Sequence, residues 1–246
     1  MSQLNRILIK FKNAYNKIVK EQTIKICIYA SLLIFLPGLL IAVLIAFFFG
    51  ANSYSIIDNY ISDLGSIRHT PAPLVLDTIA MVTGILIVPI FFYLAKIILS
   101  NNKEIIFNSN ESILRRIFYV YIDINGFIGL FSLITASIGL FGIGLFSEDR
   151  TTELGLHIAF SGIVFGGLAI GALFNGIAIA LKKTIFPRFL GIYMVIGPGT
   201  ATILFMLHPE SVTLQFLEWI MLFSAFFWLI PVVFIILNNF KLKQSH

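Results

Sequence analysis

Three histidines and a set of carboxylates are predicted to gather at one end of the folded chain. The histidines are His69, His157 and His208, whereas His246 lies at the end of the chain. The accompanying carboxylates are Asp58, Asp63, Asp77, Glu148, Asp149, Glu153, Glu210 and Glu218. Zinc accepts imidazole and carboxylate ligands, and its catalytic sites keep one position open for water. His157, His208 and His69 are therefore candidate zinc ligands, whose ring nitrogens should then lie within about 4–5 Å of one another.

Such a site could activate water or simply hold a ligand. Bound zinc lowers the pKa of its water to about 7, which makes a nucleophile at neutral pH. Asp63 and His157 are the candidate catalytic pair, as metal ligands or as acid and base. Simpler interpretations are also open. His69 could be a solvated loop residue, His208 an interface residue before Pro209, and residues 148–150 a solvated turn.

Other polar residues could line a pocket beside these groups. Glu153 and His157 are four residues apart at the start of a predicted helix, so they would share a face that Ser161 continues. Glu218 is predicted to lie inside the membrane, where a carboxylate is costly unless it is paired, protonated or hydrated. The candidate pocket residues are Ser62, Asp149, Glu153, Ser161, His208, Gln215 and Glu218.

The elements that position these residues are predicted to be membrane-spanning helices. The chain is 58% hydrophobic and 12% charged, against about 25% charged residues in soluble domains. A spanning helix needs roughly 20 apolar residues. By that measure the predicted spans are 24–49, 74–99, 117–146, 154–181, 188–207 and 212–238. The single Cys27 lies in the first span and excludes an intramolecular disulfide.

The distribution of basic residues predicts the orientation. Of the 17 Lys and Arg residues, 15 lie in the N-terminal segment, 100–116, 182–187, the C-terminal tail and the adjoining helix ends. The positive-inside rule therefore places both termini in the cytoplasm of a cell-membrane protein. The net charge of +5 is accordingly a topology signal, and nucleic acid is not an expected partner.

The predicted fold is an all-α integral membrane protein, a six-transmembrane-helix bundle with short loops. An amphipathic, basic interfacial segment occupies 1–23, the six-helix domain 24–240 and a tail 241–246. Residues 4–20 have the composition of a helix that lies in the headgroup plane of an anionic leaflet, although a flexible basic tail is the alternative. Paired glycines in the fourth span, Gly162/Gly166 and Gly167/Gly171, allow close helix contact, within the bundle or in a homodimer.

Two short segments carry a resemblance to a known family. They are Tyr60-Ile61-Ser62-Asp63-Leu64-Gly65, and Gly144-Leu145-Phe146-Ser147-Glu148-Asp149 with His157 eight residues later. In the first, Ser62 could N-cap a short re-entrant turn with Asp63 facing inward beneath it. Together they resemble the membrane family known as domain of unknown function 998, which is related in layout to the DRAM and Frag group of six-helix proteins. The resemblance implies that Ser62, Asp63, Asp149 and His157 are characteristic polar positions, and it implies no established activity.

Three functions are open from the sequence. The first is a polar, extracytoplasmic pocket that binds a lipid headgroup, an ion or a partner. The second is a membrane-embedded, zinc-dependent hydrolase of lipids or amphiphiles, because the layout is similar to the ceramidase and adiponectin-receptor-like superfamily. Those proteins have seven helices and a paired-histidine motif in the last, which this chain lacks. The third is a small-molecule transporter, for which no inverted repeat is evident.

Overall fold

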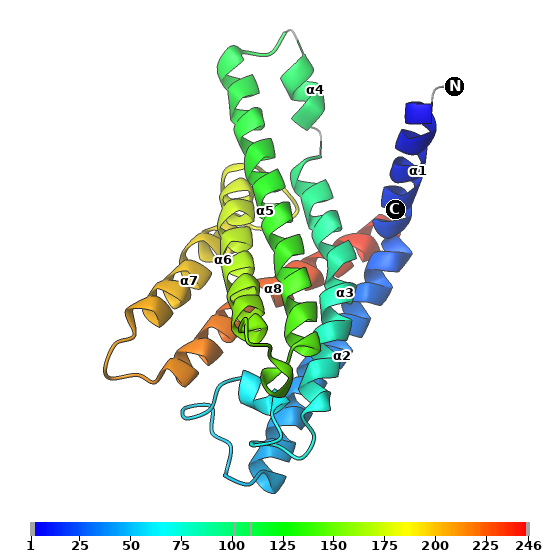
Figure 1. Ribbon diagram of the computed structural model, residues 1–246. Helices are drawn as coiled ribbons and strands as arrows, with labels where there is room; N and C mark the ends of the chain where they lie inside the picture. Colours follow the sequence, from blue (N-terminus) through cyan, green and yellow to red (C-terminus); the bar gives the residue numbers. More distant parts are fainter. Residues whose placement is uncertain (1–2, 101, 109, 245–246) are drawn as a thin grey trace.

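The computed structural model describes residues 3–100, 102–108 and 110–244, so that His246 lies outside the described residues. Every regular element in these ranges is helical, as Figure 1 shows. The α-helices and the two short 3-10 helices, η1 and η2, follow in chain order: α1 Gln3–Ile18, α2 Glu21–Phe49, η1 Ser62–Gly65, α3 Leu74–Ile98, α4 Asn102–Phe107, α5 Ile113–Leu145, η2 Glu148–Arg150, α6 Leu156–Leu181, α7 Arg188–Leu207 and α8 Leu214–Gln244.

Six of the described helices are long and apolar enough to cross a membrane: α2, α3, α5, α6, α7 and α8. This confirms the prediction of an all-α chain with six long apolar helices. The helices differ from the predicted spans mainly at their ends, since α5 starts at Ile113 and α8 continues to Gln244. Both extensions carry polar or basic residues that hydropathy alone does not assign to a helix.

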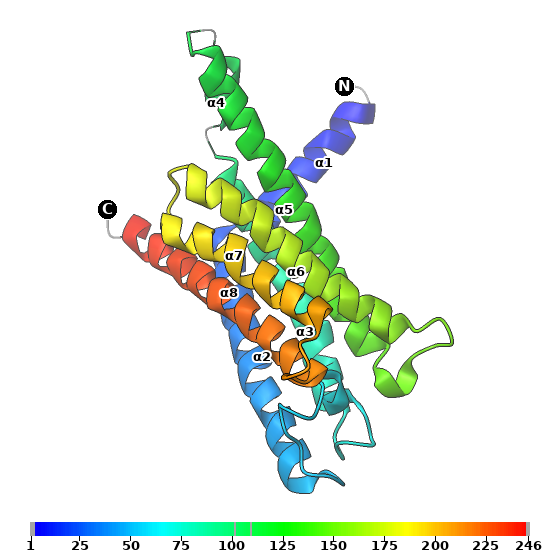
Figure 2. The ribbon, with the colours of Figure 1, turned by 90° about the vertical axis from the view of Figure 1, so that its left-hand side faces the viewer.

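The long helices form a row in which each packs mainly on its neighbours in the chain, in the order α2, α3, α5, α6, α7 and α8. The last helix, α8, also makes smaller contacts with α6 and α2, and these close the row into a bundle (Figures 1 and 2). Because these closing contacts are slight, space remains between α2, α3, α6 and α8. α1 extends away from α2 at an angle (Figure 2), and its place in a membrane interface stays a prediction.

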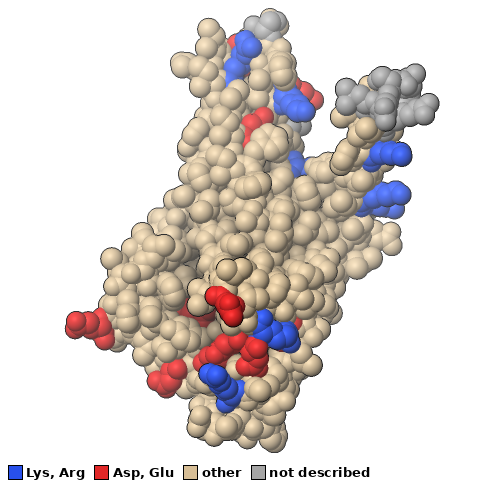
Figure 3. Space-filling model, viewed as in Figure 1, with Lys and Arg blue, Asp and Glu red and all other residues tan. Residues whose placement is uncertain are grey.

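Charge separates the two ends of the bundle. Figure 3 shows most Lys and Arg side chains near α4 and α1, with some acidic ones near α4, whereas most acidic side chains in this view gather at the opposite end with a few basic ones. We call the first the basic end. The acidic end consists of residues 50–73, 147–155 and 208–213. The start of α1 and the end of α8 lie toward the basic end in both ribbon views (Figures 1 and 2), and the cytoplasmic location of that end stays a prediction.

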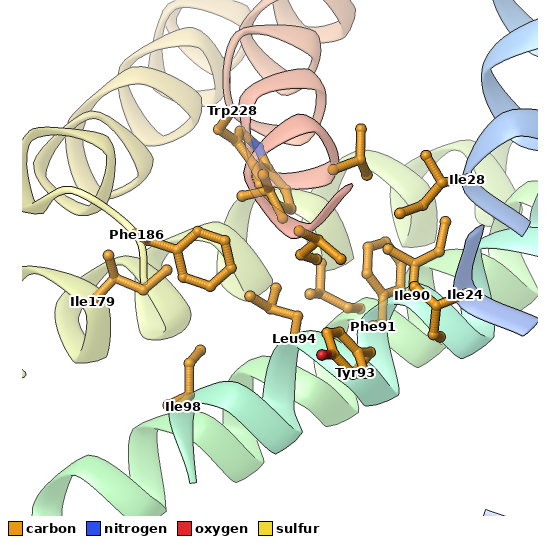
Figure 4. Close-up of a cluster of buried hydrophobic side chains, with 14 of the residues drawn as sticks. Ile24, Ile28, Ile90, Phe91, Tyr93, Leu94, Ile98, Ile179, Phe186 and Trp228 are labelled. Carbon is orange, nitrogen blue, oxygen red and sulfur yellow. The ribbon is translucent and has the colours of Figure 1, made fainter. Parts of the chain in front are cut away.

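The main buried cluster lies toward the basic end and joins α2, α3, α5, α6, α7 and α8. Figure 4 shows Trp228 of α8 facing side chains of α3, with Ile24 and Ile28 of α2 on the far side. Trp228 is fully buried. In a bilayer, helix association depends on close van der Waals packing, since lipid is as apolar as a leucine side chain. The close packing of these side chains therefore sets the spacing of the six helices.

A buried lysine closes the basic end. Lys182 is 9% exposed and follows the last residue of α6. Its Nζ donates to the carbonyl oxygens of Ile98 and Ser100, both at 2.7 Å, and to Oδ1 of Asn102 at 2.6 Å. Asn102 in turn donates through Nδ2 to Asp123 of α5. The ammonium thus satisfies carbonyls at the end of α3, where a positive charge is favoured by the helix dipole.

Glycines allow a close helix contact between α5 and α6. A Cβ at Gly167 would lie 2.8 Å from the carbonyl oxygen of Ser132 and 2.9 Å from Cβ of Ala136, and one at Gly171 would meet Leu133. The Gly167/Gly171 pair therefore packs against α5 of the same chain. A Cβ at Gly162 or Gly166 would meet no atom of the described residues within 4 Å, so a homodimer through that pair stays a prediction.

Candidate functional site

The loop of residues 50–73 is attached to α8 by hydrogen bonds to its backbone. Trp219 donates through Nε1 to the carbonyl oxygen of Asn59 at 3.2 Å, and Glu218 accepts the backbone N–H of Ile61 at 2.7 Å. Thr213 donates to the carbonyl oxygen of Ile57. Groups more than 150 residues apart are thereby joined, and η1 is held against the first turns of the last helix.

Within this loop, Asp63 organises the polar side chains. Asp63 is buried in η1, and its Oδ2 accepts the backbone N–H of Tyr60 and the Nδ2 of Asn59, both at 3.0 Å. The same Asn59 Nδ2 lies 3.5 Å from Nδ1 of His69, and Nε2 of His69 lies 3.8 Å from Oδ1 of Asp63. The predicted turn is present, but Ser62 makes no side-chain cap of it, because Ile61 is the N-cap residue.

Two adjacent residues of η2 hold the next connection in place. Asp149 accepts the hydroxyl of Ser66 at 2.8 Å and the backbone N–H of Ile67 at 2.7 Å. Arg150 donates to the carboxylate of Asp77, in the first turn of α3, at 2.7 Å. The interpretation of residues 148–150 as a solvated turn holds in part, because Asp149 and Arg150 are exposed and Arg150 also donates to the nearby carbonyl oxygens of Gly144 and Leu145. The same turn nevertheless joins both the loop and α3.

His157 lies in the first turn of α6 and is buried. Its Nδ1 lies 2.9 Å from the carbonyl oxygen of Phe146, and its backbone N–H donates to Thr151 at 3.3 Å. A ring nitrogen that contacts a carbonyl oxygen at this distance carries the proton, so that Nε2 of the neutral ring is an acceptor. This Nε2 is buried and makes no hydrogen bond with the described residues.

The structure brings together a group of side chains that could hold a metal ion, and this group differs from the predicted three histidines. Ligand atoms of Asp63, His69 and Glu148 all lie within 4.8 Å of one another, and no other such group occurs among the described residues. Of the three predicted histidines, this group contains His69 alone. His157 is outside it, and His208 is an exposed residue at the end of α7 with a left-handed backbone, φ 41°. A site shared by His69, His157 and His208 is not formed.

Burial and charge act on Glu148 in this group. Burial raises the pKa of the Glu148 carboxyl, and the neighbouring Asp63 carboxylate raises it further, whereas His69 and His157 lower it. Its Oε2 is buried and has no hydrogen-bond partner in the described part of the chain. Glu148 thus holds an unused ligand atom beside a second carboxylate, an arrangement that favours a bound cation or a proton.

Other predicted pocket residues separate into two sets. Ser62, Ser161 and Glu218 line one cavity between the helices. Glu153 is exposed and precedes α6, which begins only at Leu156, so the predicted face shared with His157 does not exist. Gln215 is half-buried in the first turn of α8 and does not line that cavity.

Two adjoining cavities run from η1 toward the middle of the bundle. The first has a volume of about 140 Å³ and lies between α2, α3, α5, α6 and α8, with Glu218, Ser62 and Ser161 at its η1 end. The second, of about 90 Å³, lies deeper between α2, α3 and α8. The residues that line both are Phe35, Thr83, Ile87, Phe226 and Leu229. The hydroxyls of Thr83 and of Ser31 in the second cavity are buried without a hydrogen-bond partner among the described residues.

Sequence reasoning placed Asp77 and Glu148 at this end without naming them as site residues, and it missed Asn59. Asn59 bridges Asp63 and His69, Asp77 pairs with Arg150, and Glu148 completes the metal-ligating group. A signal existed for Glu148, because it directly precedes Asp149 in the segment on which the family resemblance rests. No signal in the sequence distinguishes Asn59 from the other polar residues of the loop.

Searches with the chain found no matching protein-family model, no matching curated protein and no matching solved structure. The relation to domain of unknown function 998 therefore stays a prediction, and the functional argument depends on the geometry of the site.

Proposed function

We propose that this chain is a multi-pass membrane protein that binds an amphiphilic lipid, with the hydrocarbon chain in the two adjoining cavities and the polar head at Glu218. The observation that carries this proposal is that the two cavities adjoin each other. They share five lining residues and lead from the middle of the bundle to a carboxylate at the acidic end. The hydrolase and transporter alternatives have no comparable support and stay predictions.

The cavity lining favours a hydrocarbon chain. All residues that line the second cavity are apolar except Ser31 and Thr83. An apolar cavity of about 150 Å³ in a soluble protein stays dry and takes up a molecule such as benzene. The two cavities, of about 140 and 90 Å³, are therefore suited to segments of one chain that passes the shared residues.

The polar groups at the η1 end favour a head that donates hydrogen bonds. Glu218 is 8% exposed and already accepts one backbone N–H through Oε2. A second donor from the ligand, a hydroxyl or an ammonium group, would further offset the cost of a carboxylate at this depth. Ser62 and Ser161 add hydroxyls beside it. A phosphate head is disfavoured, because no Lys or Arg of the described residues lines either cavity.

The test is an analysis of the lipids that stay with the purified chain. Wild-type protein would be extracted in mild detergent, and its bound lipids would be quantified by mass spectrometry. Ala80→Leu fills the first cavity, whereas Ala159→Leu, on an exposed position of α6, is the matched control. We expect about one lipid per wild-type chain, at least a fivefold lower occupancy in Ala80→Leu, and no change in Ala159→Leu.

Glu218→Gln tests the head separately from the chain. Loss of one charge-assisted hydrogen bond is expected to weaken retention of a hydroxyl- or amine-headed lipid by about tenfold, the equivalent of about 1.4 kcal/mol. Monodisperse elution and an unchanged melting temperature would show that each variant is folded. Equal lipid occupancy in wild type and folded Ala80→Leu would overturn the proposal.

A further inference from the structure

The Asp63, His69 and Glu148 group has the composition of a metal site. Its ligand atoms come from three different segments: η1, the loop that follows it, and η2. Zinc binds imidazole nitrogen and carboxylate oxygen at about 2.0–2.2 Å, which places tetrahedral ligands about 3.4 Å apart. The 3.8 Å between Nε2 of His69 and Oδ1 of Asp63 is close to that separation.

The contacts that would orient these ligands are partly in place. Asp63 uses Oδ2 for its bonds from Asn59 and Tyr60, which leaves Oδ1 on the side of His69. Asn59 contacts both the aspartate and the histidine, and such outer contacts orient metal ligands.

Two buried atoms near the group have no partner among the described residues. One is Oε2 of Glu148, a member of the group itself, and the other is Nε2 of His157. The His157 side chain belongs to a residue that is only 8% exposed, and its Nδ1 contacts a backbone carbonyl. A histidine whose other nitrogen donates to a carbonyl has the arrangement typical of metal ligands. An unpartnered acceptor of this kind is costly to bury unless a proton or a cation comes to it.

We propose that Asp63, His69 and Glu148 bind one zinc ion, which joins the loop of residues 50–73 to η2. The mixed ligand set selects zinc over calcium, because calcium takes six to eight oxygen ligands. Three protein ligands leave a fourth position open, which a water molecule would fill. The proposal stands independently of the lipid proposal, since the two sites use different side chains.

The experiment measures zinc in the full chain, purified through a tag that contains no histidine. Protein stripped with EDTA would be dialysed against zinc, and bound metal would be measured by mass spectrometry alongside the melting temperature. We expect one zinc per chain and a saturable rise in melting temperature. His69→Ala is expected to bind at least about 100-fold more weakly, and Asn59→Ala about 10–100-fold more weakly, as for changes around other metal sites.

Two further variants keep the result interpretable. His208→Ala removes an exposed histidine at the same end and is expected to bind zinc as wild type does. Glu148→Gln preserves the shape of the side chain, so it tests the site should His69→Ala fail to fold. Zinc binding by Glu148→Gln with wild-type affinity, absence of zinc from the wild type, or retention of calcium in place of zinc would each overturn the proposal.

Discussion

The guanidinium of Arg150 lies 2.7 Å from the carboxylate of Asp77, and this ion pair joins the turn after α5 to the first turn of α3. The Asp77 side chain is 4% exposed and that of Arg150 is 44% exposed. The aspartate is thus the member of the pair that depends on its partner, because it has little access to water.

Removal of the arginine should consequently destabilise the chain. Arg150→Met leaves a buried carboxylate without its partner, which costs about 1–3 kcal/mol, with the half-exposed arginine favouring the lower end. Denaturant unfolding in detergent micelles measures the effect. Asp77→Asn added to Arg150→Met should recover part of it, whereas additive losses in the double variant would contradict a direct interaction.

Asp149 should protect the backbone of the loop against hydrogen exchange. In Asp149→Ala, Ile67 loses the acceptor of its N–H and Ser66 loses the acceptor of its hydroxyl. We expect faster hydrogen exchange in a peptide that covers residues 62–70. The free energy of unfolding should fall by no more than about 0.5–1.5 kcal/mol for each lost hydrogen bond. Glu153→Ala, in the exposed turn before α6, is the control and should leave exchange in that peptide unchanged.

The glycines of α6 should differ sharply in their tolerance of a methyl group. Gly167→Ala places Cβ against the backbone of α5, and such overpacking costs about 1–3 kcal/mol. The methyl group of Gly162→Ala would contact no described residue, so the free energy of unfolding of this variant should stay within about 0.5 kcal/mol of the wild-type value. Melting temperatures of the two purified variants provide the comparison. A folded Gly167→Ala as stable as Gly162→Ala would show that α5 and α6 do not pack as described.

Lys182 should contribute more to stability than its neighbour Lys183. Lys182→Met removes the donor that the carbonyl oxygens of Ile98 and Ser100 and the Asn102 side chain share. Ile98 keeps a hydrogen bond from Asn102, and a buried group left unsatisfied costs about 1–3 kcal/mol. Lys183 is exposed, so Lys183→Met should have little effect. Thermal unfolding measures both, and equal losses in the two variants would argue against the role assigned to Lys182.

The sequence predicts the helices better than it predicts the site. Hydropathy locates all six long helices, because each must present an apolar surface along most of its length. It places the start of α6 too early, at residue 154, because Gly155 adopts a left-handed backbone, φ 64°, before the helix begins at Leu156. That small difference removes Glu153 from the helix and from the face of His157.

The composition of the Asp63, His69 and Glu148 group depends on distances in space, which the spacing of residues along the chain does not contain. His69 reaches Asp63 because η1 turns the loop back and Asn59 contacts both side chains. His208 follows α7 on a different hairpin and takes no part in that arrangement. The predicted topology was enough to show that polar groups gather at one end of the bundle. Which of these groups lie close together could be seen only in the tertiary fold.

The attachment of residues 50–73 to α8 has a consequence for biogenesis. Chains are synthesised from the N-terminus at about 5–20 residues per second. Asp77 follows the loop closely, Glu148 and Asp149 emerge later, and the contacts with Glu218 and Trp219 come last. Over the time needed to translate some 150 residues, the loop has therefore left the ribosome without its final partners, and the acidic end can mature only after the last helix has been inserted.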